Sequence, residues 1–160
     1  MTTTFKELRS DELFEAANSV WQTVLGFSLQ RQGPPSNNEA GATFYTAWVG
    51  MSDVQHYAIY AVSDRAHICH AAAIMFDKNP ERIDETDLRD ALGELVNQIA
   101  GALINQNVLR SETGLPHIRA QGDNLPFCQQ LICATEAWCN QHHIYFAVCR
   151  YNGEWIVPEC

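Results

Sequence analysis

One stretch of the sequence, residues 86–106, has the apolar spacing of a long helix that is buried along one side. Its large apolar residues recur every three or four positions: Leu88, Leu92, Leu95, Ile99 and Leu103. A helix with a single apolar stripe has to pack that stripe against another layer of structure. Hydrophobic residues make up 46% of the 160-residue chain, which is enough to build that layer. The helix therefore predicts a packed, layered domain.

The rest of the chain supplies a second long helix and the strands of a sheet. Residues 10–26 carry apolar side chains at helical spacing, and the alanine-rich residues 66–76 also favour a helix. Residues 42–51 and 55–63 are β-rich and separated by a short polar turn, so they predict a hairpin. Further strands are expected at 27–32, 117–122, 126–138 and 142–151. This pattern is typical of an α+β fold, with two long helices packed on an antiparallel sheet in a single domain over residues 1–160.

The two long helices share a polar pattern, D-x-x-x-E-x-x-N. It occurs as Asp11, Glu15 and Asn18 in the first helix, and again as Asp90, Glu94 and Asn97 in the second. Each copy lies on a helix that is followed by strands. A duplicated half-domain would explain this internal pseudo-repeat, and so would chance.

The polar residues of the second helix lie on one side of it. At roughly 100° per residue, Asp90, Glu94, Asn97 and Gly101 fall within a strip roughly 60° wide, nearly opposite the leucines. Such a strip is typical of the solvated side of an amphipathic helix. However, a glycine inside an exposed helix is unfavourable, and it is useful where something must approach the backbone closely. An acid and an amide beside a small residue would also suit a docking surface for another protein.

Charge and hydropathy exclude several classes of partner. The net charge is -9, whereas nucleic acids and anionic membranes select for basic surfaces. No apolar run approaches the roughly 20 residues that span a bilayer, and the N-terminal residues have no apolar signal core. We therefore expect a cytoplasmic protein with no nucleic-acid or membrane partner.

The cysteines and histidines predict neither a metal site nor disulfides. None of the six cysteines forms a C-x-x-C pair, and a chain of this size with a good core needs no disulfide. Two clusters hold soft ligands: His67, Cys69 and His70, and Cys139, His142 and His143. Their spacings match no standard zinc module, so core or sheet-edge roles are expected.

The segment Asp90–Gly101 resembles the active helix of the CheC/CheX/FliY chemotaxis phosphatases. The signature of that family is a Ser or Asp, then Glu and Asn at the spacing seen in Asp90, Glu94 and Asn97, with a proline some twenty residues later; here Pro116 follows. The first helix, with its Leu-Gly end and the Gly33-Pro34 that follows, is also similar to the opening of CheX proteins. The resemblance covers most of the chain and implies a CheX-like member with a CheC-like fold.

The resemblance implies a function and roles for the residues of the motif. Proteins of this family hydrolyse the aspartyl phosphate of a CheY-type response regulator, which supplies the phosphoryl group, a Mg²⁺ ion and a lysine. The resemblance assigns Asn97 to orienting the attacking water and Glu94 to pairing with the regulator's lysine, while Asp90 and Gly101 would belong to the docking face. The chain would then need no cofactor of its own.

Two alternatives stay open from the sequence. Glu15 and Asn18 form a candidate second site, although Gln22 stands where Gly101 stands in the other copy. The chain could also be a non-catalytic CheC-like binding module that docks a receiver domain or a flagellar component.

The resemblance also implies a homodimer formed through an exposed sheet edge. Residues 142–151 are β-rich, lack proline and have one charged residue, Arg150. An edge strand of that kind is normally covered, and pairing with a second copy would cover it. The alternative is that these residues form a central strand.

Overall fold

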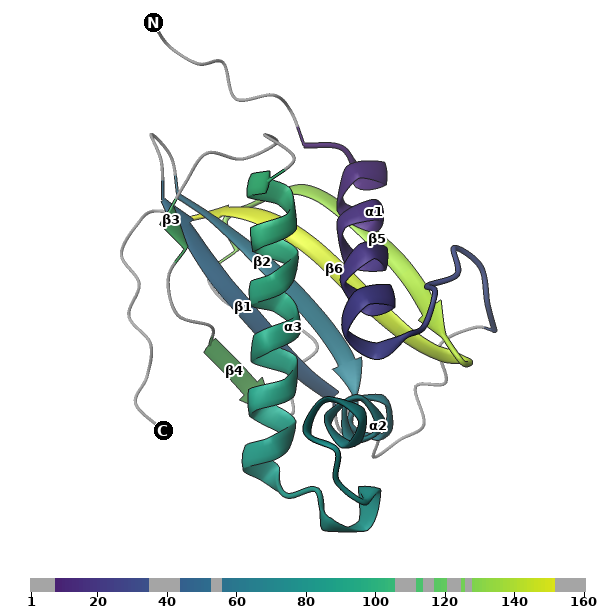
Figure 1. The fold of residues 1–160 in the computed structure, drawn as a ribbon. Helices are drawn as coiled ribbons and strands as arrows, with labels where there is room; N and C mark the ends of the chain where they lie inside the picture. Colours follow the sequence, from purple (N-terminus) through teal and green to yellow (C-terminus); the bar gives the residue numbers. More distant parts are fainter. Residues whose placement is uncertain are drawn as a thin grey trace, which may run out of the picture.

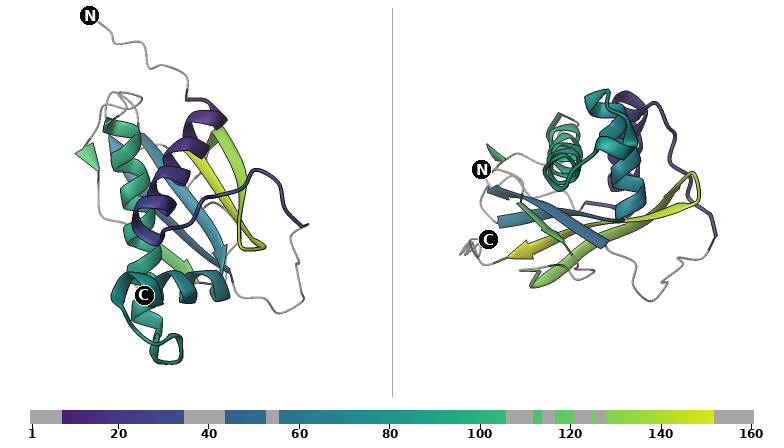
Figure 2. Two further views of the ribbon diagram at one scale, coloured as in Figure 1. Left: turned by 45° about the vertical axis from the view of Figure 1, so that its right-hand side comes forward. Right: turned by 90° about the horizontal axis from the view of Figure 1, so that it is seen from below.

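The computed structural model describes residues 8–34, 44–52, 56–105, 112–113, 117–120, 125 and 128–151. In this part of the chain, helices lie on one face of an antiparallel sheet (Figure 1). The right-hand view in Figure 2, seen from below, shows the two layers, with the helices on one side of the strands. The α+β fold class that the sequence predicted is confirmed.

The two long helices are present, and a third helix joins them. Helix α1 spans Ser10–Val20 and continues as a π-helical turn, η1, over Trp21–Leu25. Helix α2 spans Arg65–Phe76, a 3₁₀ turn η2 spans Pro80–Arg82, and α3 spans Glu85–Asn105. Helices α1 and α3 run side by side in opposite directions, and α2 lies at the end where α1 finishes and α3 begins (Figure 1). Among the described helices, none is long and apolar enough to cross a bilayer.

The sheet contains the predicted hairpin as its centre. Its strands are β1 (Phe44–Ser52), β2 (His56–Asp64), β3 (Glu112–Thr113), β4 (His117–Ala120), β5 (Gln130–Cys139) and β6 (His142–Tyr151). Their order is β3-β1-β2-β6-β5, and β4 also pairs with β1. The strand expected at 27–32 is reduced to one bridge, in which the backbones of Gln30 and Trp138 exchange hydrogen bonds of 2.8 and 2.9 Å.

Strand β6 is not an edge strand, so the edge proposed for dimerisation is wrong. It pairs with β2 on one side and with β5 on the other. The physical reason lies in its alternation: Phe146 and Val148 are buried toward the helices, while Ala147 and Cys149 are buried on the opposite face. A strand with both faces buried is an interior strand, and its neighbours in the sheet satisfy its backbone groups.

The main core lies between the helices and the sheet. The predicted apolar side of α3 is confirmed, because each of its large residues is at most 1% exposed: Leu88, Leu92, Leu95, Ile99 and Leu103. They pack against inward residues of the sheet such as Val49 and Ile59. This packing fixes which side of α3 is turned outward.

A second, smaller cluster lies on the opposite face of the sheet, around Trp48 and Tyr60. It contains a disulfide between Cys128 and Cys149, which corrects the expectation that the cysteines are unpaired. The two Cα atoms are 5.3 Å apart, within the usual range for a disulfide. Tertiary folding creates this proximity, since 21 positions separate the two cysteines in the chain.

Candidate functional site

Helix α3 is held firmly at its N-terminus. The Asp87 backbone N–H donates to Oδ1 of Asp84 at 2.9 Å, and the Asp84 N–H donates back to Oδ2 of Asp87 at 3.2 Å, so the two form a reciprocal cap. Lys78 Nζ lies 3.1 Å from Asp87, and the Tyr45 hydroxyl donates to Glu85 at 2.7 Å. The Asp84 N–H and the Lys78 ammonium together hold the pKa of Asp87 below its ordinary value. These contacts fix the helix that carries the candidate motif.

The motif residues of α3 lie on its outward side, as the sequence predicted. Asp90 and Glu94 are exposed, and Asn97 and Gly101 are half-buried. Neither Asp90 nor Asn97 makes a hydrogen bond or ion pair with the described part of the chain. A Cβ added at Gly101 would meet no described atom within 4 Å, so the surface there is open. We call the residues Asp90, Glu94, Asn97 and Gly101 the α3 stripe.

Glu94 has a partner that the sequence analysis missed. The Gln98 amide donates from Nε2 to Oε1 of Glu94 at 2.8 Å, one helical turn away. This bond orients one carboxylate oxygen along the helix and leaves Oε2 without a hydrogen bond from the described residues. The i, i+4 spacing of Glu and Gln was a usable signal for this contact.

The α3 stripe can position ligands but has no hydroxyl or thiol nucleophile. Its groups are two carboxylates and a carboxamide that both donates and accepts hydrogen bonds. Among the described residues, no group of three or more His, Cys, Asp or Glu side chains is placed to hold a metal ion. The stripe therefore suits orienting a water molecule and pairing with a cation on a docked molecule.

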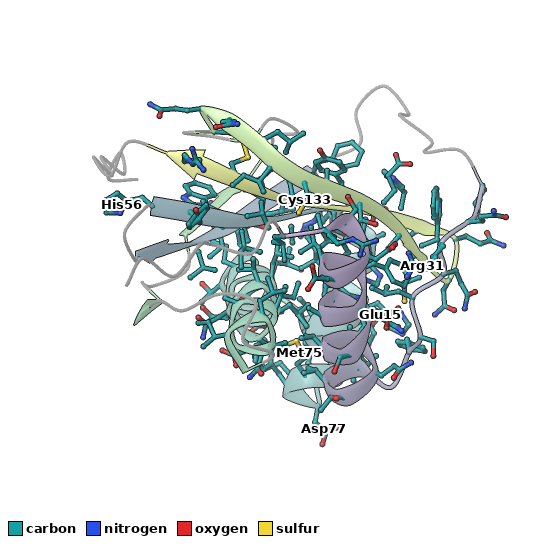
Figure 3. The ribbon with its side chains drawn as sticks, turned by 90° about the horizontal axis from the view of Figure 1, so that it is seen from above. Glu15, Arg31, His56, Met75, Asp77 and Cys133 are labelled. Atoms are coloured by element: carbon teal, nitrogen blue, oxygen red, sulfur yellow. A yellow bond between two sulfur atoms is a disulfide. The ribbon has the colours of Figure 1, made fainter. Side chains whose placement is uncertain are left out.

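The first copy of the motif is engaged by its own chain. Arg31 forms ion pairs with Asp11 at 3.2 Å and with Glu15 at 3.1 Å. The Asn18 Oδ1 accepts the backbone N–H of Leu29 at 2.8 Å. Glu15 and Arg31 lie on the side of α1 that faces away from α3 (Figure 3). The two copies of the motif thus have different surroundings.

The histidines that were weighed as zinc ligands have other roles. His67 is 4% exposed, and its Nε2 accepts the indole N–H of Trp21 at 3.1 Å. Asp64 accepts the His67 backbone N–H at 2.7 Å and lies 3.1 Å from Nδ1 of His142. Burial, together with the neighbouring His142, lowers the pKa of His67 to about 4. This network joins α2 to η1 and to the β5–β6 hairpin.

Pro116, the proline that follows the motif, lies outside the described residues.

The fold has clear counterparts among solved structures. CheX from Vibrio vulnificus superposes with a TM-score of 0.69 at 14% identity, over 88% of this chain and 94% of that one. CheX from Desulfovibrio desulfuricans superposes with a TM-score of 0.67 at 18% identity, over 88% of this chain and 97% of that one. A chain of the CheX–CheY–BeF₃–Mg²⁺ complex from Borrelia burgdorferi superposes with a TM-score of 0.64 at 15% identity, over 92% of this chain and 100% of that one.

No protein-family model and no curated protein matches this sequence. CheC-like proteins, FliY and the middle domain of FliM share the fold as well. At these levels of identity the likeness is one of fold, and it agrees with the resemblance in the motif. The fold of this chain is therefore that of the CheX, CheC-like and FliY proteins.

Proposed function

We propose that the chain is a CheX-like phosphatase that hydrolyses the aspartyl phosphate of a CheY-type response regulator. The observation that carries this proposal is the outward position of Glu94 and Asn97 on α3. Both lie on the outward side of one unbroken helix, and no other described segment covers them. A residue that must enter a partner's active site needs this exposure and this rigid support.

The chemistry suits an amide. Phosphoryl transfer depends mostly on positioning and charge stabilisation, so a catalyst can act by orienting the attacking water. The Asn97 carboxamide can accept from that water and donate to a phosphoryl oxygen, and it does not titrate. The water attacks phosphorus, the bond to the aspartyl oxygen breaks, and inorganic phosphate and the free carboxylate result.

Glu94 would dock the regulator. Its Oε1 is held by Gln98, so the carboxylate is oriented before a partner arrives. A lysine of the regulator would form a charge-assisted hydrogen bond with Oε2. The regulator carries the Mg²⁺, so the chain needs no metal of its own in this mechanism. The fold that the chain shares with the CheX of a solved CheX–CheY complex supports this choice of partner.

A second function is a non-catalytic module that docks a receiver domain or a flagellar component. It is favoured by the shared fold of FliY and the middle domain of FliM. In this case the α3 stripe would bind a partner without turnover.

Hydrolysis of a phosphorylated CheY-type receiver separates the two functions. We expect the chain to accelerate phosphate release, and Asn97→Ala to abolish the acceleration while leaving the melting temperature unchanged. The matched control is Thr86→Ala, an exposed residue roughly three turns away on α3, which should retain activity. Phosphate release at the wild-type rate by Asn97→Ala would refute the assignment, and binding without any turnover would favour the module.

The homodimer that the resemblance implies and the cytoplasmic location that the hydropathy pattern favours both stay predictions. Because β6 is an interior strand, a dimer formed through the sheet would have to use another strand. Sedimentation velocity at micromolar concentration would determine the oligomeric state.

A further inference from the structure

The segment 27–34, which we call the strap, lies against the polar side of α1 and contacts it. Every polar residue in the first copy of the motif contacts the strap. Arg31 pairs with Asp11 and Glu15, and the Leu29 N–H donates to Asn18. One turn further along, Gln22 donates from Nε2 to the Ser28 hydroxyl at 3.0 Å. The strap therefore lies where a docked partner would lie on α3.

The strap is anchored at both ends of this contact. The side chain of Leu29 is buried, at 5% exposure, within the main core. Gln30 forms a β-bridge with Trp138, and the Trp138 indole donates to the carbonyl of Pro34 at 2.8 Å. Gly33 passes so close beneath the indole ring that an added Cβ would clash with it. The strap is thus a built part of the fold.

The ion pair of Arg31 with Glu15 resembles the contact that a regulator's lysine would make with Glu94. The Arg31 guanidinium lies 4.0 Å from the centre of the Phe14 ring and bridges the carboxylates of Asp11 and Glu15. Glu15 occupies the same place in the motif as Glu94. A cation from the chain itself therefore sits at Glu15, whereas Glu94 contacts Gln98 and no described cation.

We propose that the strap is an autoinhibitory contact that closes the α1 copy of the motif to receiver domains. Arg31 takes the place at Glu15 that a receiver's lysine takes at Glu94, an assignment that rests on the proposed function. The chain then binds one receiver, on α3.

The strap blocks docking at Glu15 and catalysis at Asn18 through different contacts. Its ion pairs are exposed, since Arg31 is 50% exposed and Glu15 is 63% exposed, and such pairs contribute little to stability. Removing the Arg31 side chain should therefore leave the fold intact and free the carboxylates for docking. Asn18 stays bonded to Leu29, whose buried side chain keeps the backbone in place. The opened α1 copy should bind a receiver but not dephosphorylate it.

The experiment measures the binding of the Borrelia burgdorferi CheY, activated with beryllofluoride and Mg²⁺, by isothermal titration calorimetry. We expect one receiver per wild-type chain, and binding by Glu94→Lys that is weaker by about tenfold or more. Adding Arg31→Ala to Glu94→Lys should strengthen binding by about tenfold or more, the factor that one charge-assisted hydrogen bond supplies. Phosphate release by this double variant should stay at the background rate.

Two controls test whether the gain comes from the α1 copy. Arg9→Ala in the Glu94→Lys background removes the same charge from an exposed residue beside α1, and it should restore nothing. Glu15→Lys, added to the double variant, should abolish the regained binding. Melting temperatures show that each variant is folded.

The outcomes separate this inference from the proposed function. A wild-type chain that binds, with a double variant that binds no better than Glu94→Lys alone, overturns the autoinhibitory contact and leaves the α3 site standing. The autoinhibitory contact is also overturned if Arg9→Ala strengthens receiver binding as much as Arg31→Ala does. A wild-type chain that does not bind the activated receiver overturns the proposed function, and this inference with it.

Discussion

Acid should destabilise the folded protein through one buried histidine, His67. In the fold it is 4% exposed and accepts the indole N–H of Trp21, so its ring must keep Nε2 unprotonated. Its titratable neighbours are His142, His70 and Asp64; positive charge on either histidine opposes protonation of His67, and the Asp64 carboxylate favours it. Burial is the largest cause, and the pKa falls from 6.5 to about 4.

The direction and size of the effect follow from proton linkage. Between pH 6.5 and 4 the unfolded chain binds a proton at His67 that the folded chain does not bind, so the free energy of unfolding falls as the pH falls. Full stability is present above pH 6.5 and is lost as the pH drops toward 4. A shift of this size corresponds to about 3 kcal/mol in total, with a slope of at most about 1.4 kcal/mol per pH unit.

The assay is urea unfolding, followed by circular dichroism, at several pH values from 7.5 to about 4. The comparison is with His67→Gln, whose amide can accept from Trp21 but does not titrate. Carboxylates titrate in both proteins, so the difference between their pH profiles isolates His67. The free energy of unfolding of the wild type should fall by about 3 kcal/mol more than that of the variant over this pH range. His70→Gln, on the exposed side of the same helix, should behave like the wild type. Parallel profiles for wild type and His67→Gln, or an NMR titration of His67 near 6.5, would refute the reasoning.

Three further predictions concern the motif copies and the disulfide. Asn18→Ala should lower the free energy of unfolding by about 1–2 kcal/mol, because it leaves the Leu29 N–H without its acceptor. Asn97→Ala should change the free energy of unfolding by less than about 0.5 kcal/mol. Urea unfolding measures both changes, and equal losses would contradict the different roles of the two residues. Glu94→Lys should weaken binding of an activated CheY-type receiver by about tenfold or more, as calorimetry can measure, and unchanged affinity would count against this docking mode. Reducing the Cys128–Cys149 disulfide should lower the melting temperature, because opening a loop of this length releases chain entropy worth up to about 3 kcal/mol; calorimetry with and without reductant tests this, and identical melting curves would argue against it.

Local patterns in the sequence were enough to place the helices and the outward side of α3. The leucine spacing determined which side of α3 is buried, and therefore that Glu94 and Asn97 face outward. The hairpin of β1 and β2 followed from two β-rich runs with a short polar separator. These features depend on neighbours within a few residues, where periodicity carries the information.

Contacts between distant segments were decided by the tertiary structure. The spacing D-x-x-x-E-x-x-N is identical in α1 and α3, and it could not show that Arg31 would fold back onto Glu15 while no described segment covers the α3 stripe. The composition of β6 suited an unprotected edge, but its place between β2 and β5 depends on how the whole sheet is ordered. The Cys128–Cys149 disulfide and the bond from Trp21 to His67 likewise join segments that the sequence keeps apart. A sequence pattern states which groups each element presents, and the packing of all the elements together determines what those groups meet.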